Sequence, residues 1–185
     1  MSEVSKILGI SGSLRAQSFN TALLHSARGL MPSGATLEVA TLHGIPLYDG
    51  DVEQRGIPQA VTALKERVVQ NQGLLLVTPE YNNSIPGVFK NAIDWLSRPP
   101  GEGARIFGGR PVALIGASPG GFGTILSQNA WLPVLHTLGA RVFSGARLMA
   151  SRADKTLGTG GDALEAALGK QLQEFLQKFV EFVRK

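Results

Sequence analysis

The 185-residue sequence contains no cysteine. Without thiols the chain cannot form a disulfide scaffold, ligate an iron–sulfur cluster or a thiolate zinc site, or use a cysteine nucleophile. A chain of this length is long enough to bury a sizeable core without such cross-links. Its expected organisation is therefore one domain that covers residues 1–185.

Long apolar segments are also absent. No window approaches the roughly 18 consecutive apolar residues that a transmembrane helix requires. The first thirteen residues, MSEVSKILGISGS, contain neither the apolar core of a signal peptide nor a small-residue cleavage site. The sequence therefore predicts a cytoplasmic protein that is not inserted in a membrane.

Aromatic residues make up only 6% of the chain, whereas the formal net charge is +4. The positive excess is concentrated between Arg98 and Arg152, where the only acidic residue is Glu102. Nucleic-acid-binding surfaces usually combine clustered Lys and Arg with aromatic residues or a reading motif, and here the arginines are single and widely spaced. The pattern favours a local site for an anionic small molecule, or a solvated face, over binding to nucleic acid.

Short apolar segments alternate with amphipathic ones along the chain. The apolar segments predict five strands, at residues 6–10, 37–42, 74–78, 111–117 and within 140–150. The amphipathic segments predict five helices, from Ser18 to just before Pro32, and at 58–72, 88–96, 124–138 (bent or interrupted at Pro133) and 163–183.

This alternation is typical of an α/β fold, in which an open parallel sheet carries helices on both faces. Right-handed crossovers place every strand-to-helix loop at the carboxyl edge of such a sheet, where ligands bind at the switch in strand order. The loops expected there span residues 11–17, 43–57, 79–87 and 118–123. Residues that bind a ligand should therefore lie in these four loops.

The first of these loops lies within GISGSLRAQSFN, residues 9–20. It matches neither the GxGxxG fingerprint nor the Walker phosphate loop, because the third glycine and the Gly-Lys-Ser/Thr ending are missing. It nevertheless offers an anion a helix N-terminus, with Arg15 able to add a bidentate contact. Further donors are the side chains of Ser11, Ser13, Ser18 and Asn20. We interpret the loop as a phosphate site; the alternative is an ordinary polar turn with Ser18 as helix N-cap.

The second loop, TPEYNNSIPG at residues 78–87, follows a continuous apolar strand. Its two prolines stiffen it, so that its backbone groups can meet the edge of a flat heterocycle, with Tyr81 as a stacking or covering ring. Asn82, Asn83 and Ser84 supply further donors and acceptors. A stiff loop that only satisfies its own Asx turns explains the segment equally well.

The third loop, GASPGGFG at residues 116–123, matches the GxSxG nucleophile elbow at Ser118. The oxyanion hole of that elbow needs the backbone N–H of the residue after the serine, and Pro119 has none. No acidic residue lies between Ser118 and His136, the last histidine, so the required order of serine, acid and histidine is missing. We therefore exclude hydrolase chemistry and interpret the glycines as positions where the backbone approaches a ligand closely.

No metal site is predicted. Residues 49–53 resemble the start of a calcium loop, but the glycine and the glutamate that the loop requires further on are missing. His25, His43 and His136 fall in three separate elements without the spacing of metal ligands. We interpret them as surface or core histidines.

Three segments together resemble the flavodoxin-like NAD(P)H-dependent FMN reductases, a family that includes bacterial quinone, chromate and azo-dye reductases. The segments are GSLRAQSFN at 12–20, TPEYNNSIPGVFKNAIDWLSRP at 78–99 and GASPGG at 116–121, and IPLYDGDVEQ at 45–54 is similar as well. The resemblance implies a three-layer α/β/α flavodoxin-like fold with a five-stranded parallel sheet in the order 2-1-3-4-5. It also implies a homodimer or homotetramer with FMN near the subunit interface.

The resemblance further implies which residues contact the FMN cofactor. The residues implied to hold its phosphate are Ser13, Arg15, Ser18 and Asn20, and Ser11 is counted with them as cofactor-binding. The residues implied to frame the isoalloxazine ring are Pro79, Glu80, Tyr81, Asn82 and Ser84. The residues implied to lie along the ring or the ribityl chain are Ser118, Gly120 and Gly121. No side chain is expected to be an obligatory catalytic acid or base.

On this resemblance, NADPH or NADH gives a hydride to FMN N5, and the flavin then passes two electrons to a small-molecule acceptor in a ping-pong cycle. The acceptor is a quinone or a similar compound (chromate, an azo compound or free flavin). One or more arginines between Arg98 and Arg152 are expected to assist the NADPH phosphate or an anionic acceptor. The main alternative is a flavodoxin-type electron carrier, which the basic charge and Arg15 disfavour. A third is a phosphate-binding regulatory α/β domain without flavin.

Overall fold

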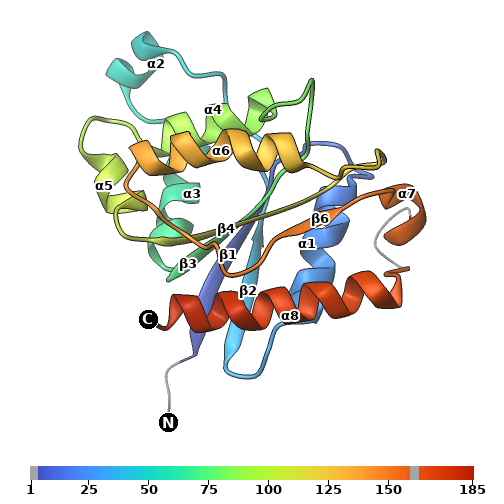
Figure 1. Cartoon of the computed structure of the whole chain (residues 1–185). Helices are drawn as coiled ribbons and strands as arrows, with labels where there is room; N and C mark the ends of the chain where they lie inside the picture. The colour runs from blue at the N-terminus through green and yellow to red at the C-terminus, as the bar shows by residue number, and fades with distance from the viewer. Residues whose placement is uncertain (1–3, 159–162) are drawn as a thin grey trace.

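The computed structural model describes residues 4–158 and 163–185 (Figure 1). One sheet runs through the molecule, and its neighbouring strands are parallel. Its strands are β1 (Ser5–Ser11), β2 (Ala35–Ala40), β3 (Gly73–Val77), β4 (Pro111–Ala117), β5 (Arg141–Val142) and β6 (Leu148–Ala150). The order is β2-β1-β3-β4-β5, with β6 also paired to β4, so the predicted order 2-1-3-4-5 is confirmed.

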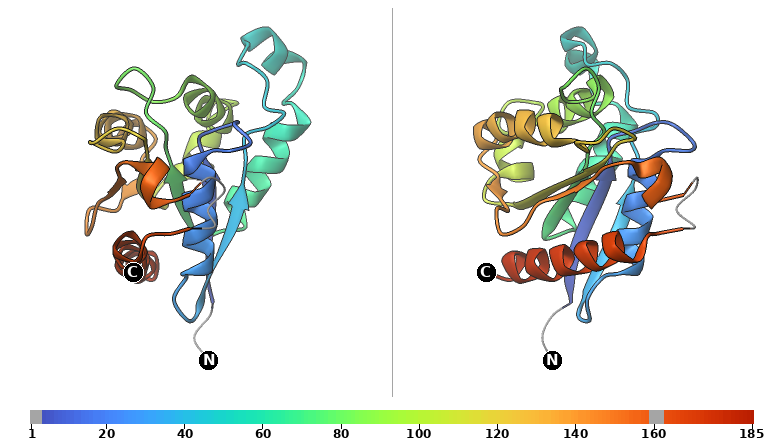
Figure 2. Two further views of the ribbon diagram at one scale, coloured as in Figure 1. Left: turned by 90° about the vertical axis from the view of Figure 1, so that its right-hand side faces the viewer. Right: turned by 45° about the vertical axis from the view of Figure 1, so that its right-hand side comes forward.

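Helices cover both faces of the sheet. They are α1 (Phe19–Gly29), α2 (Gly50–Arg55), α3 (Gln59–Val69), α4 (Gly87–Leu96), α5 (Glu102–Phe107), α6 (Ile125–Thr137), α7 (Ala153–Thr156) and α8 (Ala166–Val183). Helices α1 and α8 lie on one face of the sheet, and α3, α4, α5 and α6 lie on the other (Figure 2). The apolar side chains of each set form a core with the sheet. The expected α/β/α architecture is confirmed. None of the described helices is long and apolar enough to cross a bilayer.

The central strands are buried as their continuous apolar sequences predict. Every residue of β3 and β4 is buried, because helices cover both faces and neighbouring strands flank both edges. Gly9 of β1 allows α1 to pack closely, since a Cβ there would lie 2.3 Å from Leu24 Cδ1. The glycine is therefore needed for the packing of helix on strand, and this packing places the N-terminus of α1 at the carboxyl edge of the sheet.

The single fifth strand expected within residues 140–150 is wrong. The structure has two short strands there, β5 and β6, and both pair with β4. Phe143 still donates its backbone N–H to the Val112 carbonyl of β4 at 2.8 Å, and its ring packs against Phe175 and Phe179 of α8 at centroid distances of 5.4 and 5.5 Å. Residues 144–147 then leave the sheet before β6 begins, and the apolar run gave no sign of this break.

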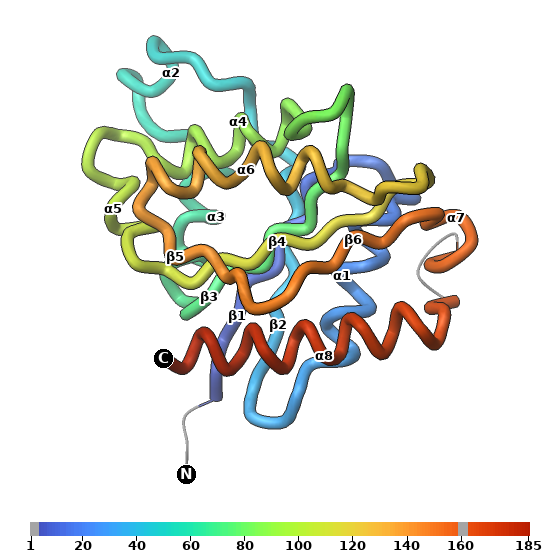
Figure 3. The backbone as a smooth tube through the Cα atoms, in the orientation of Figure 1, coloured from blue at the N-terminus to red at the C-terminus, as the bar shows by residue number. Residues whose placement is uncertain are grey.

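Three short helices, α2, α5 and α7, were not expected from the sequence. The first lies inside the predicted loop 43–57 and has no buried residue, so apolar periodicity could not reveal it. It begins at Asp49, whose carboxylate accepts a hydrogen bond of 2.8 Å from the Asp51 N–H as an N-cap. Figure 3 shows that α2 stands away from the rest of the backbone.

Two helix boundaries also differ from expectation. The last helix begins at Ala166 rather than at residue 163. Pro133 does not interrupt α6, which is one helix from residue 125 to 137. Proline leaves the carbonyl four residues earlier without its helical partner, and here that residue, Asn129, is exposed, so water can satisfy the group.

Candidate functional site

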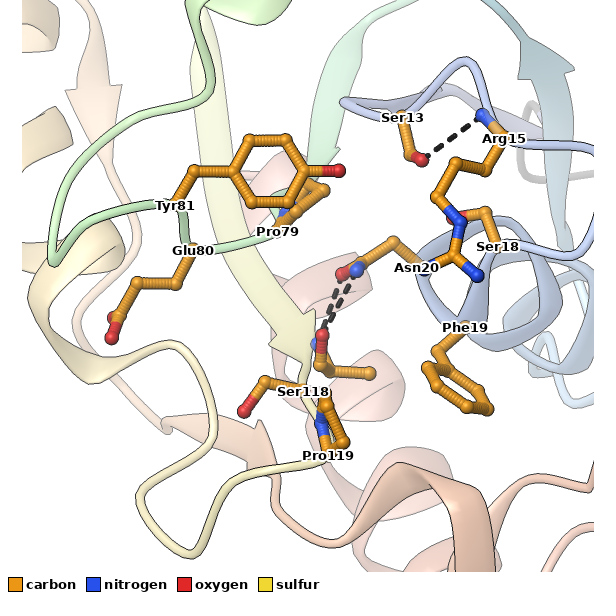
Figure 4. A pocket seen from close by; sticks show the side chains of 11 residues that line it. Ser13, Arg15, Ser18, Phe19, Asn20, Pro79, Glu80, Tyr81, Ser118 and Pro119 are labelled. Atoms are coloured by element: carbon orange, nitrogen blue, oxygen red, sulfur yellow. Dashed lines mark hydrogen bonds between the residues drawn. The ribbon is translucent and has the colours of Figure 1, made fainter.

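A pocket opens at the carboxyl edge of the sheet, where the loops after β1, β3 and β4 meet (Figure 4). It lies beside the switch in strand order between β1 and β3. Its lining residues are Ser13, Arg15, Ser18, Phe19, Asn20, Pro79, Glu80, Tyr81, Ala117, Ser118 and Pro119. Eight of the thirteen predicted cofactor-binding residues are among them; the other five, Ser11, Asn82, Ser84, Gly120 and Gly121, are not.

One end of the pocket faces the N-terminus of α1. Ser18 caps the helix, because its side chain accepts a hydrogen bond of 3.3 Å from the Thr21 N–H. The N–H groups of Phe19 and Asn20 in the first turn donate to no atom of the described residues. Together with the positive end of the helix dipole, these free donors favour an anion at this end of the pocket.

Ser13 and Arg15 complete this end of the pocket. The Ser13 hydroxyl is buried and accepts a hydrogen bond of 3.3 Å from the Arg15 N–H, which holds the turn that carries the arginine. The Arg15 side chain is exposed and extends toward Ser18 (Figure 4). Among the described residues of the lining, Arg15 is the one with a positively charged side chain. An anion here would therefore meet a guanidinium as well as helix N–H groups.

Two of the predicted phosphate contacts have other partners in the structure. The Ser11 hydroxyl is fully buried and shares a hydrogen bond of 2.8 Å with the Thr21 hydroxyl, outside the pocket lining. The Asn20 carboxamide lines the pocket but pairs with both backbone groups of Ala117 at 2.9 Å. Both side chains thus join α1 to the sheet.

The loop after β3 contributes an aromatic wall. Tyr81 is 47% exposed, and Figure 4 shows its ring beside Pro79 at the opening of the pocket. The backbones of Tyr81 and Ser84 exchange two hydrogen bonds of 3.2 and 3.0 Å across a turn. Asn82 and Asn83 in that turn have φ of +50° and +60°, the left-handed conformation that asparagine tolerates well. The turn fixes the base of Tyr81 and points Asn82 and Ser84 outward, where both are exposed.

Glu80 points away from the pocket and caps α6. Its Oε2 accepts hydrogen bonds of 2.8 and 2.9 Å from the N–H groups of Leu126 and Ser127. The N-cap residue Thr124 makes no capping hydrogen bond with its side chain, whose hydroxyl instead accepts from Gln128 Nε2 at 3.1 Å. Glu80 therefore supplies the missing acceptor from another loop. The helix dipole offsets the negative charge of Glu80, so the lining as a whole remains attractive to an anion.

The loop after β4 is closed by its own hydrogen bonds. The Ser118 hydroxyl donates to the Gly123 carbonyl at 2.6 Å, and its backbone N–H donates to the Ala150 carbonyl at 3.0 Å. Gly123 has φ +63° and a Cβ there would lie 2.8 Å from Met149, so the glycine is required by the turn itself. A Cβ on Gly121, by contrast, would meet nothing within 4 Å. Only at such open positions can glycine be explained by access for a ligand.

Three lining residues were not predicted: Phe19, Ala117 and Pro119. Phe19 looked like the first residue of the apolar stripe of its helix, and its position next to the N-cap was the signal that could have placed it at the site. Ala117 and Pro119 flank Ser118, which was predicted. Their small or rigid side chains carry no chemical signal, and only the fold brings them to the pocket.

The arginines between residues 98 and 152 do not gather at the pocket. Arg105 forms an ion pair of 2.8 Å with Glu102, and Arg110 donates to backbone carbonyl groups. Arg152 lies next to the site, because its backbone N–H donates to the Gly120 carbonyl at 3.0 Å. The hypothesis of an arginine that assists an anionic substrate is therefore best placed on Arg152.

The pKa shifts that the fold produces occur away from the pocket lining. Burial lowers the pKa of the Lys65 ammonium, which the nearby Glu102 carboxylate partly offsets. Burial also lowers the pKa of Arg110. The hydrogen bond of the Tyr48 hydroxyl to Glu53, 2.8 Å long, raises the pKa of that tyrosine. These groups join α3, α5 and the segment around α2 to their neighbours.

Comparison with known proteins connects this site to a family. Residues 5–155 match the family model described as NADPH-dependent FMN reductase. The chain is 42% identical over 185 residues to an NAD(P)H-dependent FMN reductase of Pseudomonas aeruginosa, covering 100% of this chain and 98% of the relative. It is 36% identical over 190 residues to a quinone reductase of Escherichia coli K12, covering 100% of this chain and 98% of that protein.

A solved structure is similar over nearly the whole fold. The flavoenzyme NAD(P)H:(acceptor) oxidoreductase FerB of Paracoccus denitrificans superposes with a TM-score of 0.86 and 33% sequence identity. The superposition covers 98% of each chain. The similarity therefore includes the segments that form the pocket as well as the sheet and its helices.

Proposed function

The chain belongs to the NADPH-dependent FMN reductase family, and from this premise we propose that the pocket at the carboxyl edge binds FMN. The protein is an NAD(P)H-dependent reductase of the FMN reductase and quinone reductase type. Its co-substrate is NADPH or NADH, and its acceptor is a quinone or a similar small molecule. The observation that carries the proposal is the set of free donors and one guanidinium around the N-terminus of α1.

The residues present fit the phosphate of FMN. A phosphate dianion needs several N–H and O–H donors and a positive field, and the N–H groups of Phe19 and Asn20 are free to donate. We assign phosphate binding to these N–H groups and to the side chains of Ser13, Arg15 and Ser18. The acidic side chain that lines the pocket, Glu80, is already bonded to the N-terminus of α6.

The rest of the lining fits a flat ring and its polar edge. Pro79 and Tyr81 offer apolar surface, and the backbone from Ser118 to Gly121 is open on its outer side. When bound, FMN supplies the hydride and two-electron chemistry, so that no side chain has to serve as an obligatory acid or base. The side chains bind the phosphate, orient the ring and leave one face open to a second small molecule.

We also propose that the protein forms a homo-oligomer through the outer face of α6. This helix carries apolar residues on both sides: Trp131 and Leu135 are fully buried, whereas Leu126 and Leu132 are 45% and 43% exposed. Phe122, just before the helix, is 85% exposed. The exposed side also carries Asn129 and His136, and exposed apolar residues with polar neighbours are typical of a protein–protein interface. Sedimentation of the purified protein tests this, and Leu132→Glu should shift a dimer or tetramer toward the monomer.

The alternative of a flavodoxin-type carrier predicts bound flavin without NAD(P)H oxidation. The experiment that decides is steady-state oxidation of NADPH and NADH by the purified protein with FMN and a benzoquinone. The reductase proposal predicts rapid turnover with parallel lines in double-reciprocal plots, the pattern of a ping-pong cycle. A protein that binds FMN but oxidises neither nucleotide would support the carrier, and one that ignores FMN would contradict both.

A further inference from the structure

Asn20 is buried between the N-terminus of α1 and the end of β4, with 4% of its surface exposed. Its Nδ2 donates to the Ala117 carbonyl and its Oδ1 accepts from the Ala117 N–H, each at 2.9 Å. Figure 4 shows both bonds as dashed lines. One side chain thus satisfies both backbone groups of a residue 97 positions later in the chain.

These bonds connect the two halves of the pocket. Asn20 directly follows residues 13–19, which surround the proposed phosphate position, and Ala117 directly precedes residues 118–121, which we place along the ring. The carboxamide oxygen and one of its two N–H groups are engaged with Ala117. The distance between the two halves therefore depends on a side chain that the sequence predicted as a phosphate ligand.

We propose that the side chain of Asn20 is a positioning residue, which ties the first loop to the third and sets the length of the FMN site before the cofactor binds. The inference rests on the proposed function, because it names what the tie positions. A site that is already spaced correctly loses less conformational freedom when its ligand binds, and affinity rises for that reason. A phosphate ligand would instead act on the phosphate alone.

The test compares FMN with riboflavin, which has the same ring and ribityl chain but no phosphate. Dissociation constants are measured from the quenching of flavin fluorescence by the native protein and by Asn20→Ala. We expect the variant to bind both flavins about tenfold more weakly, because the spacing of the site affects ring and phosphate alike. If FMN binding weakens and riboflavin binding does not, Asn20 is a phosphate ligand and the proposal is wrong.

The chain offers a matched control in Asn71, a second buried asparagine with 5% of its surface exposed. Its Nδ2 donates to Glu38 at 3.0 Å and to the Arg67 carbonyl at 2.8 Å, at the opposite edge of the sheet. Asn71→Ala removes two partly buried side-chain hydrogen bonds and should lower the melting temperature without changing either dissociation constant. An equal loss of flavin affinity in this control would mean general destabilisation and would overturn the proposal.

A measurement without flavin tests the link between the first and third loops, which we call the tie, separately from cofactor binding. We expect amide hydrogen exchange in residues 118–123 of the flavin-free protein to be faster in Asn20→Ala and in Asn20→Asp, which loses the donor to Ala117, than in the native protein or Asn71→Ala. Unchanged exchange in both variants would refute the tie. If the native protein binds neither flavin while exchange responds as expected, the tie stands and the proposed function fails.

Discussion

Two arginines at opposite edges of the sheet illustrate how this fold separates structure from function. Arg110 precedes β4 at the amino edge, where its guanidinium donates to the carbonyl oxygens of Ile106 and Asn71. Arg15 follows β1 at the carboxyl edge, where its exposed guanidinium makes no hydrogen bond to the described residues. The arginine whose donors are already bonded holds the fold together, and the one with free donors marks the pocket.

Removal of the exposed arginine should have the largest effect on the cofactor. Hydrogen bonds to charged groups contribute about 1.5–3 kcal/mol, so Arg15→Ala should raise the dissociation constant of FMN roughly 10- to 100-fold. Riboflavin affinity and the melting temperature should change little, because the side chain contacts neither the ring subsite nor the core. Fluorescence titration and thermal unfolding measure the three quantities. If the variant binds FMN as tightly as the native protein does, Arg15 does not contact the cofactor.

Removal of the bonded arginine should have the opposite result. Arg110→Met leaves two backbone carbonyl groups without their donors, and we expect a loss of about 1–3 kcal/mol in the free energy of unfolding. Urea denaturation measures this loss, and FMN affinity should stay within twofold of the native value. A variant with unchanged stability and weakened FMN binding would reverse the roles assigned to the two arginines.

Substitution of two tyrosines, one in the pocket and one outside it, should have smaller effects than substitution of the arginines. An aromatic contact contributes about 0.5–1.5 kcal/mol beyond simple burial, so Tyr81→Ala should weaken FMN binding or raise KM for a quinone about three- to tenfold. Tyr48 is a matched control, since it is also partly exposed but lies before α2, against Trp95 at a centroid distance of 5.0 Å. Tyr48→Ala should leave both constants unchanged. Equal effects of the two substitutions would contradict the placement of the ring at Tyr81.

The smallest expected effect is the pH-dependent contribution of Glu38, at the amino edge of the sheet, to the stability of the fold. Burial raises the pKa of the Glu38 carboxyl, but hydrogen bonds from Asn71 and Arg67 and the charge of Arg67 outweigh it, so the pKa lies below its ordinary value of 4.5. A depressed pKa stabilises the fold above the unfolded-state pKa, and this stabilisation is lost as the pH falls through the folded-state pKa.

Glu38→Gln should therefore destabilise the protein at pH 7 by less than about 1 kcal/mol, because the pair is half exposed. The difference from the native protein should shrink as the pH falls below 4.5 and through the folded-state pKa, where the carboxylate becomes protonated. Urea denaturation over a series of pH values from 7 downward measures the difference, and FMN binding at pH 7 should not respond. A difference that grows on acidification would mean that the pKa of Glu38 is raised.

The buried strand β3 and the place of the pocket at the carboxyl edge of the sheet followed from the sequence because each rests on local chemistry. The continuous apolar run that forms β3 could only be a strand buried on both faces, and GISGSLRAQSFN combined a strand end, polar donors and a helix start. The resemblance to a known family supplied the strand order. The helix α2, which has no buried residue, and the break between β5 and β6 left no pattern in the sequence that could predict them.

The role of each side chain within the site was harder to predict, because it depends on whether that side chain is already hydrogen-bonded to another part of the protein. Asn20 looks like a phosphate ligand in the sequence because it is polar and lies in the first loop, and the resemblance implied that Glu80 frames the ring. In the structure Asn20 pairs with the backbone of Ala117, and Glu80 caps α6. These partners lie 46 to 97 positions away in the chain, and only the folded arrangement reveals them. That Arg15 and Ser18 line the pocket was predictable, because both lie where β1 leads into α1; their contact with a phosphate stays a prediction.

The most direct test of the central claim is a single-turnover experiment on the FMN-loaded protein without oxygen. On mixing with excess NADPH or NADH, the visible absorbance of the flavin should bleach, and it should return fully when a benzoquinone is added. Arg15→Ala, at FMN concentrations that saturate the native protein, should show a smaller amplitude because less cofactor is bound. A flavin that stays oxidised with both nucleotides, or a native protein that retains no FMN, would contradict the assignment of this pocket to an NAD(P)H-dependent reductase.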